Sequence, residues 1–287
     1  MRHRLALRIG PVAFRIGSAW AAPLAELARL YAPYPAADGA ADFTVRLEPA
    51  APWRRIIRPS VAIAGDYTLP DAAPLPLAQG LLAAEMGMNL QMALGQKRFL
   101  LLHAGVVERD GKALILTGPS GAGKSTLAAL LGTRGWRFMG DEFGLLDPES
   151  GLLHPFPRAI SLKNASLALF DDVDPERLGP VLRGTPKGTI RHLRPPADAI
   201  ARMAHSARPA LILFPRFGRD LPATQRPVGA AEVFVRLTQA STNYVSLGER
   251  GFGALTALVG GTPARAIDYS STEEAIGLVE QTWAAQG

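Results

Sequence analysis

The stretch ALILTGPSGAGKSTLAALLGTRGWRFMGDE, residues 113–142, decides how the fold is read. An apolar run typical of a buried strand leads into a glycine-rich loop, and a helical segment follows the loop as far as Arg134. Residues 118–125 match the pattern G-x-x-x-x-G-K-[ST], and a strand before it and a helix after it are the context that this pattern requires. The sequence therefore predicts a phosphate-binding loop.

The residue types of this loop indicate its chemistry. Glycines allow successive backbone N–H groups to turn towards phosphate oxygens, and the helix that follows adds the positive end of its dipole. We expect Lys124 to reach the β- and γ-phosphates, and the Ser125 hydroxyl to bind Mg²⁺. The residues predicted to contact the nucleotide are Gly118, Pro119, Ser120, Gly121, Ala122, Gly123, Lys124, Ser125 and Thr126.

Two adjacent carboxylates, Asp141 and Glu142, follow the predicted strand WRFMG. We expect this strand to lie alongside the loop strand, so that its carboxyl end shares the edge where ligands bind in α/β sheets. One carboxylate would then bind the metal, and the same one or the other would accept a proton from an attacking hydroxyl. The alternative is a capped turn with solvated acids.

The order of these segments resembles a known family. HAGVVERDGKALILTGPSGAGKST followed by RGWRFMGDE resembles the HPr kinase/phosphorylase family, in which a His-containing segment, a phosphate loop and a strand ending in two acids occur in this order. The segments LRIGPVAFRI, PFPRAISLKN, TPKGTIRHLRPP and NYVSLGERGF resemble the subgroup called HprK-related kinase A, so the resemblance covers almost the whole chain. The core of this family is related to that of phosphoenolpyruvate carboxykinases.

The resemblance implies a role for each matching residue. It implies His103 near the transferred phosphoryl group, Lys124 in the phosphate loop, and Asp141 as general base on the acceptor hydroxyl. Ser125, Asp141 and Glu142 are the implied metal set, although Glu142 stands where the family commonly has a second Asp. The glycine-rich signature of the phosphorylase reaction is not recognised, so only the kinase direction is expected.

Composition limits the classes of protein to consider. With 48% apolar and 20% charged residues, the 287-residue chain can build a sizeable core. It has no cysteine, which excludes disulfides and thiolate chemistry and fits a cytoplasmic protein. The net charge of +6 comes without an aromatic-interleaved basic stripe, so we expect phosphorylated ligands and not nucleic acid. No uncharged apolar run reaches about 18 residues, so no membrane span or membrane partner is expected.

The predicted fold class is α/β. A P-loop core with a mixed sheet, residues 76–287, is expected to follow a smaller β-rich portion, residues 1–75. Asp110-Gly111 predicts a tight hairpin between apolar runs 99–107 and 113–117. The other elements expected are two strands in 3–17, a helix at 20–31, the strand FTVRLE, a hairpin at 56–69, a helix from about 77 to 96, a hairpin at 151–163, a loop at 171–196, a strand near 210–217, helices at 229–240 and 249–260, a strand at 264–269 and a C-terminal helix opened by Ser271 or Thr272.

Several residues outside the two motifs are further candidates for the site. Lys163, Lys187 and Arg191 are candidate phosphate or substrate contacts, the last two within the basic stretch 171–196. This stretch is read either as a mobile cationic lid or as a solvated loop. Asn243 and Tyr244 are candidates for the substrate side.

These observations predict a kinase that uses ATP and Mg²⁺ to phosphorylate a hydroxyl, in the first place a serine of a small protein or peptide. A small-molecule hydroxyl is the first alternative acceptor. A nucleotide-gated binding module with slow hydrolysis is a second alternative. A decarboxylating enzyme like the carboxykinases is least favoured, because no second metal-site constellation is seen. ATP against GTP and a homo-oligomeric state stay open.

Overall fold

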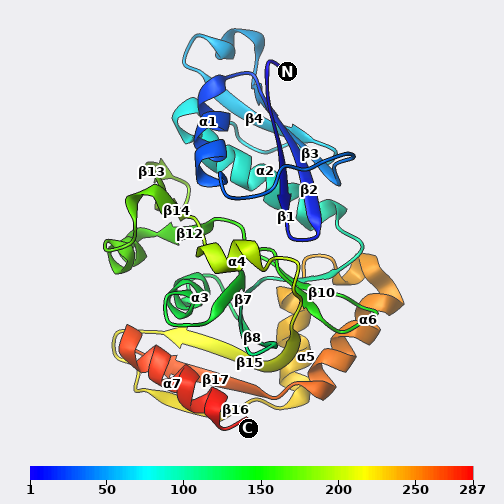
Figure 1. The fold of residues 1–287 in the computed structure, drawn as a ribbon, viewed down its shortest axis with the longest axis vertical. Coiled ribbons are helices and arrows are strands. Elements are labelled where there is room, and N and C mark those ends of the chain that lie inside the picture. Colours follow the sequence, from blue (N-terminus) through cyan, green and yellow to red (C-terminus); the bar gives the residue numbers. More distant parts are fainter. Residues whose placement is uncertain (287) are drawn as a thin grey trace. The chain divides into compact units, whose positions relative to one another are not determined.

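The computed structural model describes residues 1–286, which form two compact units (Figure 1). The first unit contains Met1–Gln96 and Ala159–Arg194, and the second contains Lys97–Arg158 and the chain from Pro195 onward. Residues 76–96 and 159–194 therefore group with the N-terminal portion, unlike in the division expected at residue 75. Residues 76–96 belong to the first unit because helix α2 (Gly80–Gly95) contacts the N-terminal strands β3 and β4.

The first unit is built on a five-stranded sheet with the strand order β1-β2-β3-β4-β5. Helix α1 (Ala21–Leu30) joins β2 to the parallel strand β3, and both α1 and α2 contact the sheet. A Cβ at Gly87 would lie 2.5 Å from Val45 Cγ1, so glycine lets α2 approach β3 closely. The strands are β1 (His3–Ile9), β2 (Val12–Ser18), β3 (Phe43–Pro49), β4 (Ser60–Gly65) and β5 (Leu75–Pro76).

A second, three-stranded sheet of the first unit has the order β12-β14-β13. Its strands are β12 (Ile160–Lys163), β13 (Leu178–Thr185) and β14 (Gly188–Leu193), with the short helices η3 (Asn164–Phe170) and η4 (Pro175–Arg177) between the first two. The loop predicted for 171–196 is therefore wrong, because most of this stretch forms the hairpin β13–β14. Two register shifts along that hairpin disturb the apolar alternation from which strands are predicted.

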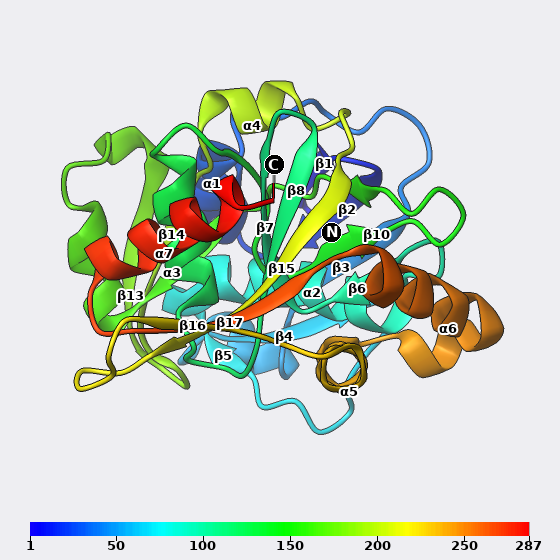
Figure 2. The same cartoon turned by 90° about the horizontal axis from the view of Figure 1, so that it is seen from below.

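The second unit is built on a six-stranded mixed sheet with the order β16-β17-β15-β8-β7-β9 (Figure 2). Strands β8, β15 and β17 are parallel, while β7 is antiparallel to both of its neighbours, β8 and β9. The strands are β7 (Ala104–Arg109), β8 (Lys112–Thr117), β9 (Arg137–Gly140), β15 (Arg208–Phe217), β16 (Thr224–Pro227) and β17 (Ala264–Tyr269).

Helices cover both faces of this sheet. Val106, Ile115 and Phe214 belong to one apolar cluster with residues of α5 (Ala230–Ala240) and α6 (Tyr244–Gly261). Gly105 lies next to Val106 in β7, and a Cβ there would lie 3.0 Å from Ala128 Cβ of α3 (Lys124–Gly132). Helix α7 (Thr272–Ala284) contacts α3 and β17. The strands are therefore buried on two sides, which explains their continuous apolar runs.

The predicted hairpin at Asp110-Gly111 is confirmed as the turn between β7 and β8. Arg109 pairs with Lys112, and both turn residues have positive φ, 54° and 75°, as a two-residue hairpin turn requires. The apolar run 99–107 forms two strands and not one, because His103 separates β6 (Leu100–Leu102) from β7. Strand β6 pairs with β10 (Gly144–Leu146), which also pairs with β11 (Leu153–His154).

Two other hairpins predicted from the sequence are wrong. Within 56–69 only β4 forms, and it pairs with β3 and β5. Within 151–163, β11 pairs in the second unit and β12 pairs in the first. The predicted strands at 3–17 and 264–269 and the helices at 20–31 and 229–240 are confirmed, as is the C-terminal helix, whose cap Ser271 accepts a hydrogen bond from the Glu274 N–H.

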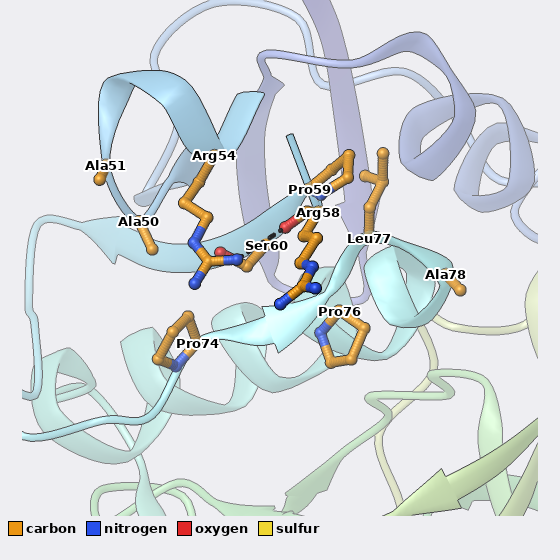
Figure 3. A pocket seen from close by; sticks show the side chains of 10 residues that line it. All are labelled: Ala50, Ala51, Arg54, Arg58, Pro59, Ser60, Pro74, Pro76, Leu77 and Ala78. Atoms are coloured by element: carbon orange, nitrogen blue, oxygen red, sulfur yellow. Dashed lines mark hydrogen bonds between the residues drawn. The ribbon is translucent and has the colours of Figure 1, made fainter. Parts of the chain in front are cut away.

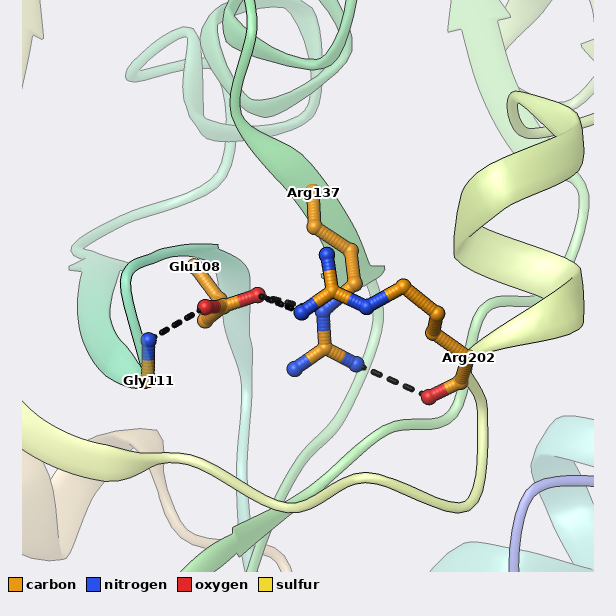
Figure 4. A network of polar contacts seen from close by, with 4 residues as sticks. All are labelled: Glu108, Gly111, Arg137 and Arg202. Atoms are coloured by element: carbon orange, nitrogen blue, oxygen red, sulfur yellow. Dashed lines mark hydrogen bonds and ion pairs between the residues drawn. The ribbon is translucent and has the colours of Figure 1, made fainter.

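The amino-terminal end of β9 carries a buried charge network (Figure 4). Arg137 Nε donates a hydrogen bond to Glu108 Oε2, and Arg202, just after α4 (Ala197–Ala201), lies 3.4 Å from the same oxygen. The other Glu108 oxygen accepts from the Gly111 N–H. Burial raises the pKa of Glu108, but the hydrogen bonds from Arg137 and Gly111 and the charges of Arg137 and Arg202 outweigh it, so the pKa is lowered.

No helix within residues 1–286 combines the length and the apolar character that a membrane crossing needs.

Candidate active site

The predicted site residues of the second unit gather at one edge of its six-stranded sheet. Ala104, at the start of β7, pairs with Thr117 at the end of β8, and Val106 pairs with Gly140 at the end of β9. The expectation that WRFMG lies beside the loop strand is wrong, because β7 lies between β8 and β9. Since β7 is antiparallel to both, the carboxyl ends of β8 and β9 still share an edge, as predicted.

The glycine-rich loop connects β8 to α3 at this edge. Gly118, Gly121 and Gly123 have φ values of 150°, 85° and 91°, which L side chains rarely adopt. A Cβ at Gly121 would meet nothing within 4 Å, whereas a Cβ at Gly123 would lie 2.5 Å from the Tyr269 hydroxyl. Gly123 is thus required for conformation and for space. Helix α3 begins directly after it, at Lys124.

Lys124 is buried, and its ammonium group lies against the loop itself. Its Nζ donates hydrogen bonds to the carbonyl oxygens of Gly118 at 2.8 Å and Pro119 at 3.0 Å. The loop therefore wraps around a cationic group, at the position where the first turn of α3 presents its backbone N–H groups. Ser125 and Thr126 follow in that turn and are partly exposed.

Tyr269 and Phe217 lie on the side of the loop away from β7. They end β17 and β15, and their rings are 5.9 Å apart. The Tyr269 hydroxyl donates to the Ala122 carbonyl at 3.3 Å, and burial raises the pKa of Tyr269 to about 12. Phe217 is 50% exposed, and its Cβ lies 3.9 Å from the position of a Cβ on Gly123. The Tyr269 ring therefore supports the loop, whereas the Phe217 ring is exposed where a ligand could contact it.

His103 is held at the start of β7 by its backbone. Its N–H donates to the Ala240 carbonyl at 2.8 Å, and its carbonyl accepts from the buried Thr117 hydroxyl at 3.1 Å. The imidazole Nδ1 lies 3.2 Å from the Glu142 carbonyl oxygen and 3.7 Å from Glu142 Oε1. The sequence neighbours Asp141 and Glu142 therefore differ in setting, because Glu142 faces His103.

Asp141 is 8% exposed and directly follows a β-bulge. Phe138 pairs with Val107 and Gly140 with Val106, so Met139 is an extra residue of β9. The Met139 carbonyl accepts a hydrogen bond from the Phe156 N–H at 2.6 Å. A Cβ on Gly140 would lie 3.0 Å from the Phe143 carbonyl oxygen and 3.3 Å from that of Phe156, which explains the glycine before Asp141.

The three basic candidates lie in the first unit, on the sheet β12-β14-β13. Lys163 ends β12, and Lys187 is exposed in the turn between β13 and β14. Arg191 Nε donates to the Gly179 carbonyl at 2.9 Å, which ties its side chain to β13. Their roles as phosphate or substrate contacts stay predictions.

Asn243 is not a substrate-side residue. It is 4% exposed, its Nδ2 donates to the Phe99 carbonyl at 2.8 Å, and its Oδ1 accepts from the Leu101 N–H at 2.9 Å. It thus clamps β6, the strand that leads to His103. Tyr244 is partly buried, and its ring packs against Phe234, at 6.4 Å between centroids.

Sequence reasoning missed Tyr269, Phe217 and Thr117. Phe217 and Tyr269 are the last residues of strands that were predicted, so their place at the carboxyl ends was the available signal. In the part of the chain that the structure describes, no three His, Asp or Glu side chains converge in a way that would hold a metal ion by themselves.

Comparison with known proteins gives one family match. Residues 81–211 are similar to the family described as SynChlorMet cassette protein ScmC. The matched stretch is less than half of the chain and includes the glycine-rich loop and both carboxylates, but the description names no activity. No curated protein matches the chain. The resemblance to HPr kinases therefore stays a prediction from the sequence motifs.

Proposed function

We propose that this protein is an ATP- and Mg²⁺-dependent kinase that phosphorylates a hydroxyl, in the first place a serine of a small protein or peptide. The observation that supports this most is the convergence of the loop 118–125, His103 and Asp141 on one sheet edge. A phosphate-binding loop alone fits many nucleotide-dependent proteins. A carboxylate and an imidazole beside it add the means to activate an acceptor hydroxyl. The proposed location is the cytoplasm.

The order of the strands gives the nucleotide a direction. The carboxylates and His103 lie on the β7–β9 side of the loop, and Phe217 and Tyr269 lie on the β15–β17 side. The γ-phosphate would point to the first side, where the acceptor is activated. The nucleoside would then extend to the second side, where the exposed ring of Phe217 can stack on a base.

In this proposal Asp141 is the general base. The acceptor oxygen forms a bond to the γ-phosphorus, its proton passes to the Asp141 carboxylate, and the bond between the γ-phosphorus and its bridging oxygen breaks to release ADP. Lys124, now against the Gly118 and Pro119 carbonyls, would turn to the phosphate oxygens and stabilise the developing charge.

Glu142 is proposed to position His103. With its Nδ1–H donating to the Glu142 carbonyl oxygen, His103 would turn Nε2 towards the transferred phosphoryl group, and in the imidazolium form Nε2–H would donate a hydrogen bond to a phosphoryl oxygen. The extra methylene of Glu142, compared with an aspartate, lets its carboxylate reach within 3.7 Å of the imidazole. This separates the two acids into a base and an orienting group.

The residues of this edge fit Mg²⁺ by their donor chemistry. Mg²⁺ is bound in such sites by one or two carboxylates, waters and substrate phosphates, not by an all-protein cage. The Ser125 hydroxyl and a carboxylate of Asp141 or Glu142 supply oxygen donors of this kind. When bound, the ion would neutralise charge on the β- and γ-phosphates.

The test is transfer of labelled γ-phosphate to the peptides and small proteins encoded beside this gene. Asp141→Asn should reduce transfer about 10²- to 10⁴-fold and leave the Kd for ATP within about threefold of the parent. Asp110→Asn is the matched control, because it changes an aspartate of the turn at the other end of β7 to a residue that tolerates positive φ.

Three results would contradict the proposal. Undiminished transfer by the Asp141→Asn variant would refute the assignment of Asp141 as the general base. Hydrolysis of ATP without transfer to any acceptor would favour the nucleotide-gated binding module. Phosphorylation of free serine-like metabolites alone would favour a small-molecule kinase.

A further inference from the structure

A short turn of the first unit exposes three large apolar side chains. It consists of η1 (Pro52–Arg55) and the residues up to Pro59. Trp53, Ile56 and Ile57 are 63%, 83% and 65% exposed. Single exposed apolar residues are ordinary on protein surfaces, but a group of three within five consecutive positions is typical of an interaction site.

The same turn is basic. Arg54, Arg55 and Arg58 alternate with the apolar residues, and positions 49–65 contain no aspartate or glutamate. Tryptophan and arginine are the residue types that contribute most to binding at protein interfaces. The combination therefore suits a partner segment that is both apolar and acidic.

Hydrogen bonds hold this turn in place. Trp20 Nε1 donates to the Arg55 carbonyl at 3.0 Å, and Arg54 Nη1 donates to the Arg58 carbonyl at 3.3 Å. Arg58 has a φ of 46°, a left-handed conformation that is uncommon for residues other than glycine. The side chains are thus presented by a folded turn, which lowers the entropy lost on binding.

A pocket of about 770 Å³ lies between this turn and the segment that contains β5 and η2 (Leu77–Gln79) (Figure 3). The guanidinium groups of Arg54 and Arg58 extend from the turn towards Pro74 and Pro76. The lining residues carry these two positive charges and no negative charge; they are Ala50, Ala51, Arg54, Arg58, Pro59, Ser60, Pro74, Pro76, Leu77 and Ala78.

We infer that this turn and its pocket form a docking surface for an acidic, apolar peptide segment of a partner protein. A carboxylate of the segment would pair with Arg54 and Arg58 in the pocket, and its apolar side chains would cover Trp53, Ile56 and Ile57. An anionic membrane offers the same charge, but a bilayer surface cannot enter a pocket between the turn and the proline segment. Peptide docking does not rest on the proposed function, although a docked segment would suit a kinase with a peptide acceptor.

The inference is tested by selecting binders from a random-peptide display library on the full-length protein. The expected result is enrichment of peptides that combine Asp or Glu with large apolar residues. Binding of the best labelled peptide, followed by fluorescence anisotropy, should weaken at least about tenfold in Arg54→Glu/Arg58→Glu. Ile56→Ser/Ile57→Ser should weaken it through the apolar contact. Arg4→Glu/Arg15→Glu, two exposed arginines of the same unit, is the matched control and should bind as the parent does.

Other results would overturn the inference. These are a selection without acidic apolar peptides, binding unchanged in both test variants, and binding of phosphatidylserine vesicles when no selected peptide binds. Circular dichroism melting of each variant shows whether it is folded. If the Arg54→Glu/Arg58→Glu variant is not folded, the Ile56→Ser/Ile57→Ser variant tests the inference. ATP affinity, measured on the same proteins, tests the proposed function separately, because neither pair of residues belongs to the candidate active site.

Discussion

The two ends of strands β7, β8 and β9 use charge in opposite ways. At one end, Glu108, Arg137 and Arg202 form a network whose hydrogen bonds are made within the protein. At the other end, Lys124 donates hydrogen bonds to the Gly118 and Pro119 carbonyls of the glycine-rich loop, and Asp141, Glu142 and His103 lie at the same edge.

The charges at one end of these strands are therefore expected to affect the stability of the fold, and those at the other end the proposed reaction. A charge that is paired and buried contributes to folding, and removing its partner leaves an uncompensated charge in the interior. A charge at the carboxyl edge of parallel strands lies where ligands bind in α/β folds. Variants at the two ends should therefore change different measurements.

Among the variants that compare the two ends of the strands, the largest effect is expected from Lys124→Ala. Loss of the ammonium group should lower kcat/KM for phosphoryl transfer about 1,000-fold, because the charge on the phosphates would lose a stabilising partner. Lys112→Ala is the matched control, since Lys112 is an exposed lysine at the other end of β8. Steady-state kinetics with saturating acceptor measures both, and equal rates for the two variants would remove the distinction between the ends.

Glu108→Gln should act on folding alone. The loss of a buried partner of Arg137 should lower the free energy of unfolding by about 3–5 kcal/mol, as measured by urea denaturation at neutral pH. Glu48→Gln is the control, because the pair of Glu48 with Arg46 is exposed and its loss should cost about 1 kcal/mol or less. ATP affinity of the folded Glu108→Gln protein should match that of the parent; a large loss would mean that the network also shapes the site.

The same residue predicts a pH dependence. The pKa of Glu108 is lowered in the folded protein, so its contribution to stability is complete above its ordinary value of 4.5. This contribution is lost as the pH falls from 4.5 through the folded value, where the carboxylate becomes protonated. Denaturation midpoints of the parent should therefore fall more steeply in that range than those of Glu108→Gln, and parallel curves would contradict this.

The smallest effect is expected from Phe217→Ala, which tests the proposed nucleoside side of the candidate site. Loss of a stacking ring should weaken ATP binding by about 1 kcal/mol, or about fivefold in Kd. Binding of tripolyphosphate, which has no base, should be unchanged. Phe252→Ala removes a phenylalanine of similar exposure, 53%, from α6 and is the control in the same calorimetric titrations. If Phe217→Ala weakened the binding of ATP and of tripolyphosphate equally, Phe217 would not contact the nucleoside.

The sequence predicted which residues share one edge of the sheet better than it predicted the order of the strands that form this edge. The loop and the turn Asp110-Gly111 have local signatures, because their backbone conformations favour particular residues. The two carboxylates were located by their short distance from the loop in the sequence. The position of β7 between β8 and β9 depends on pairing between strands, and both pairings bury similar apolar runs. Periodicity cannot distinguish them.

The hairpin β13–β14 shows a different limit. Its register shifts and its exposed Arg183 and Lys187 hide the alternation that predicts a strand. Tyr269 shows a third limit, because its contact with Ala122 joins residues far apart in the sequence. Asn243 is a predicted candidate for the substrate side, whereas its amide hydrogen-bonds to the Leu101 N–H of β6 and to the Phe99 carbonyl just before this strand.

The bulge at Met139 determines which of the two acids is buried, because it adds one residue to β9. Successive residues of a strand point to opposite faces, so one additional residue exchanges the face of everything that follows it. With Met139 in place, Asp141 is buried at the edge and Glu142 turns to His103. A strand shorter by one residue would give the buried position to the longer acid, so the choice of Asp141 as the proposed base depends on the length of β9 as well as on the residues that follow it.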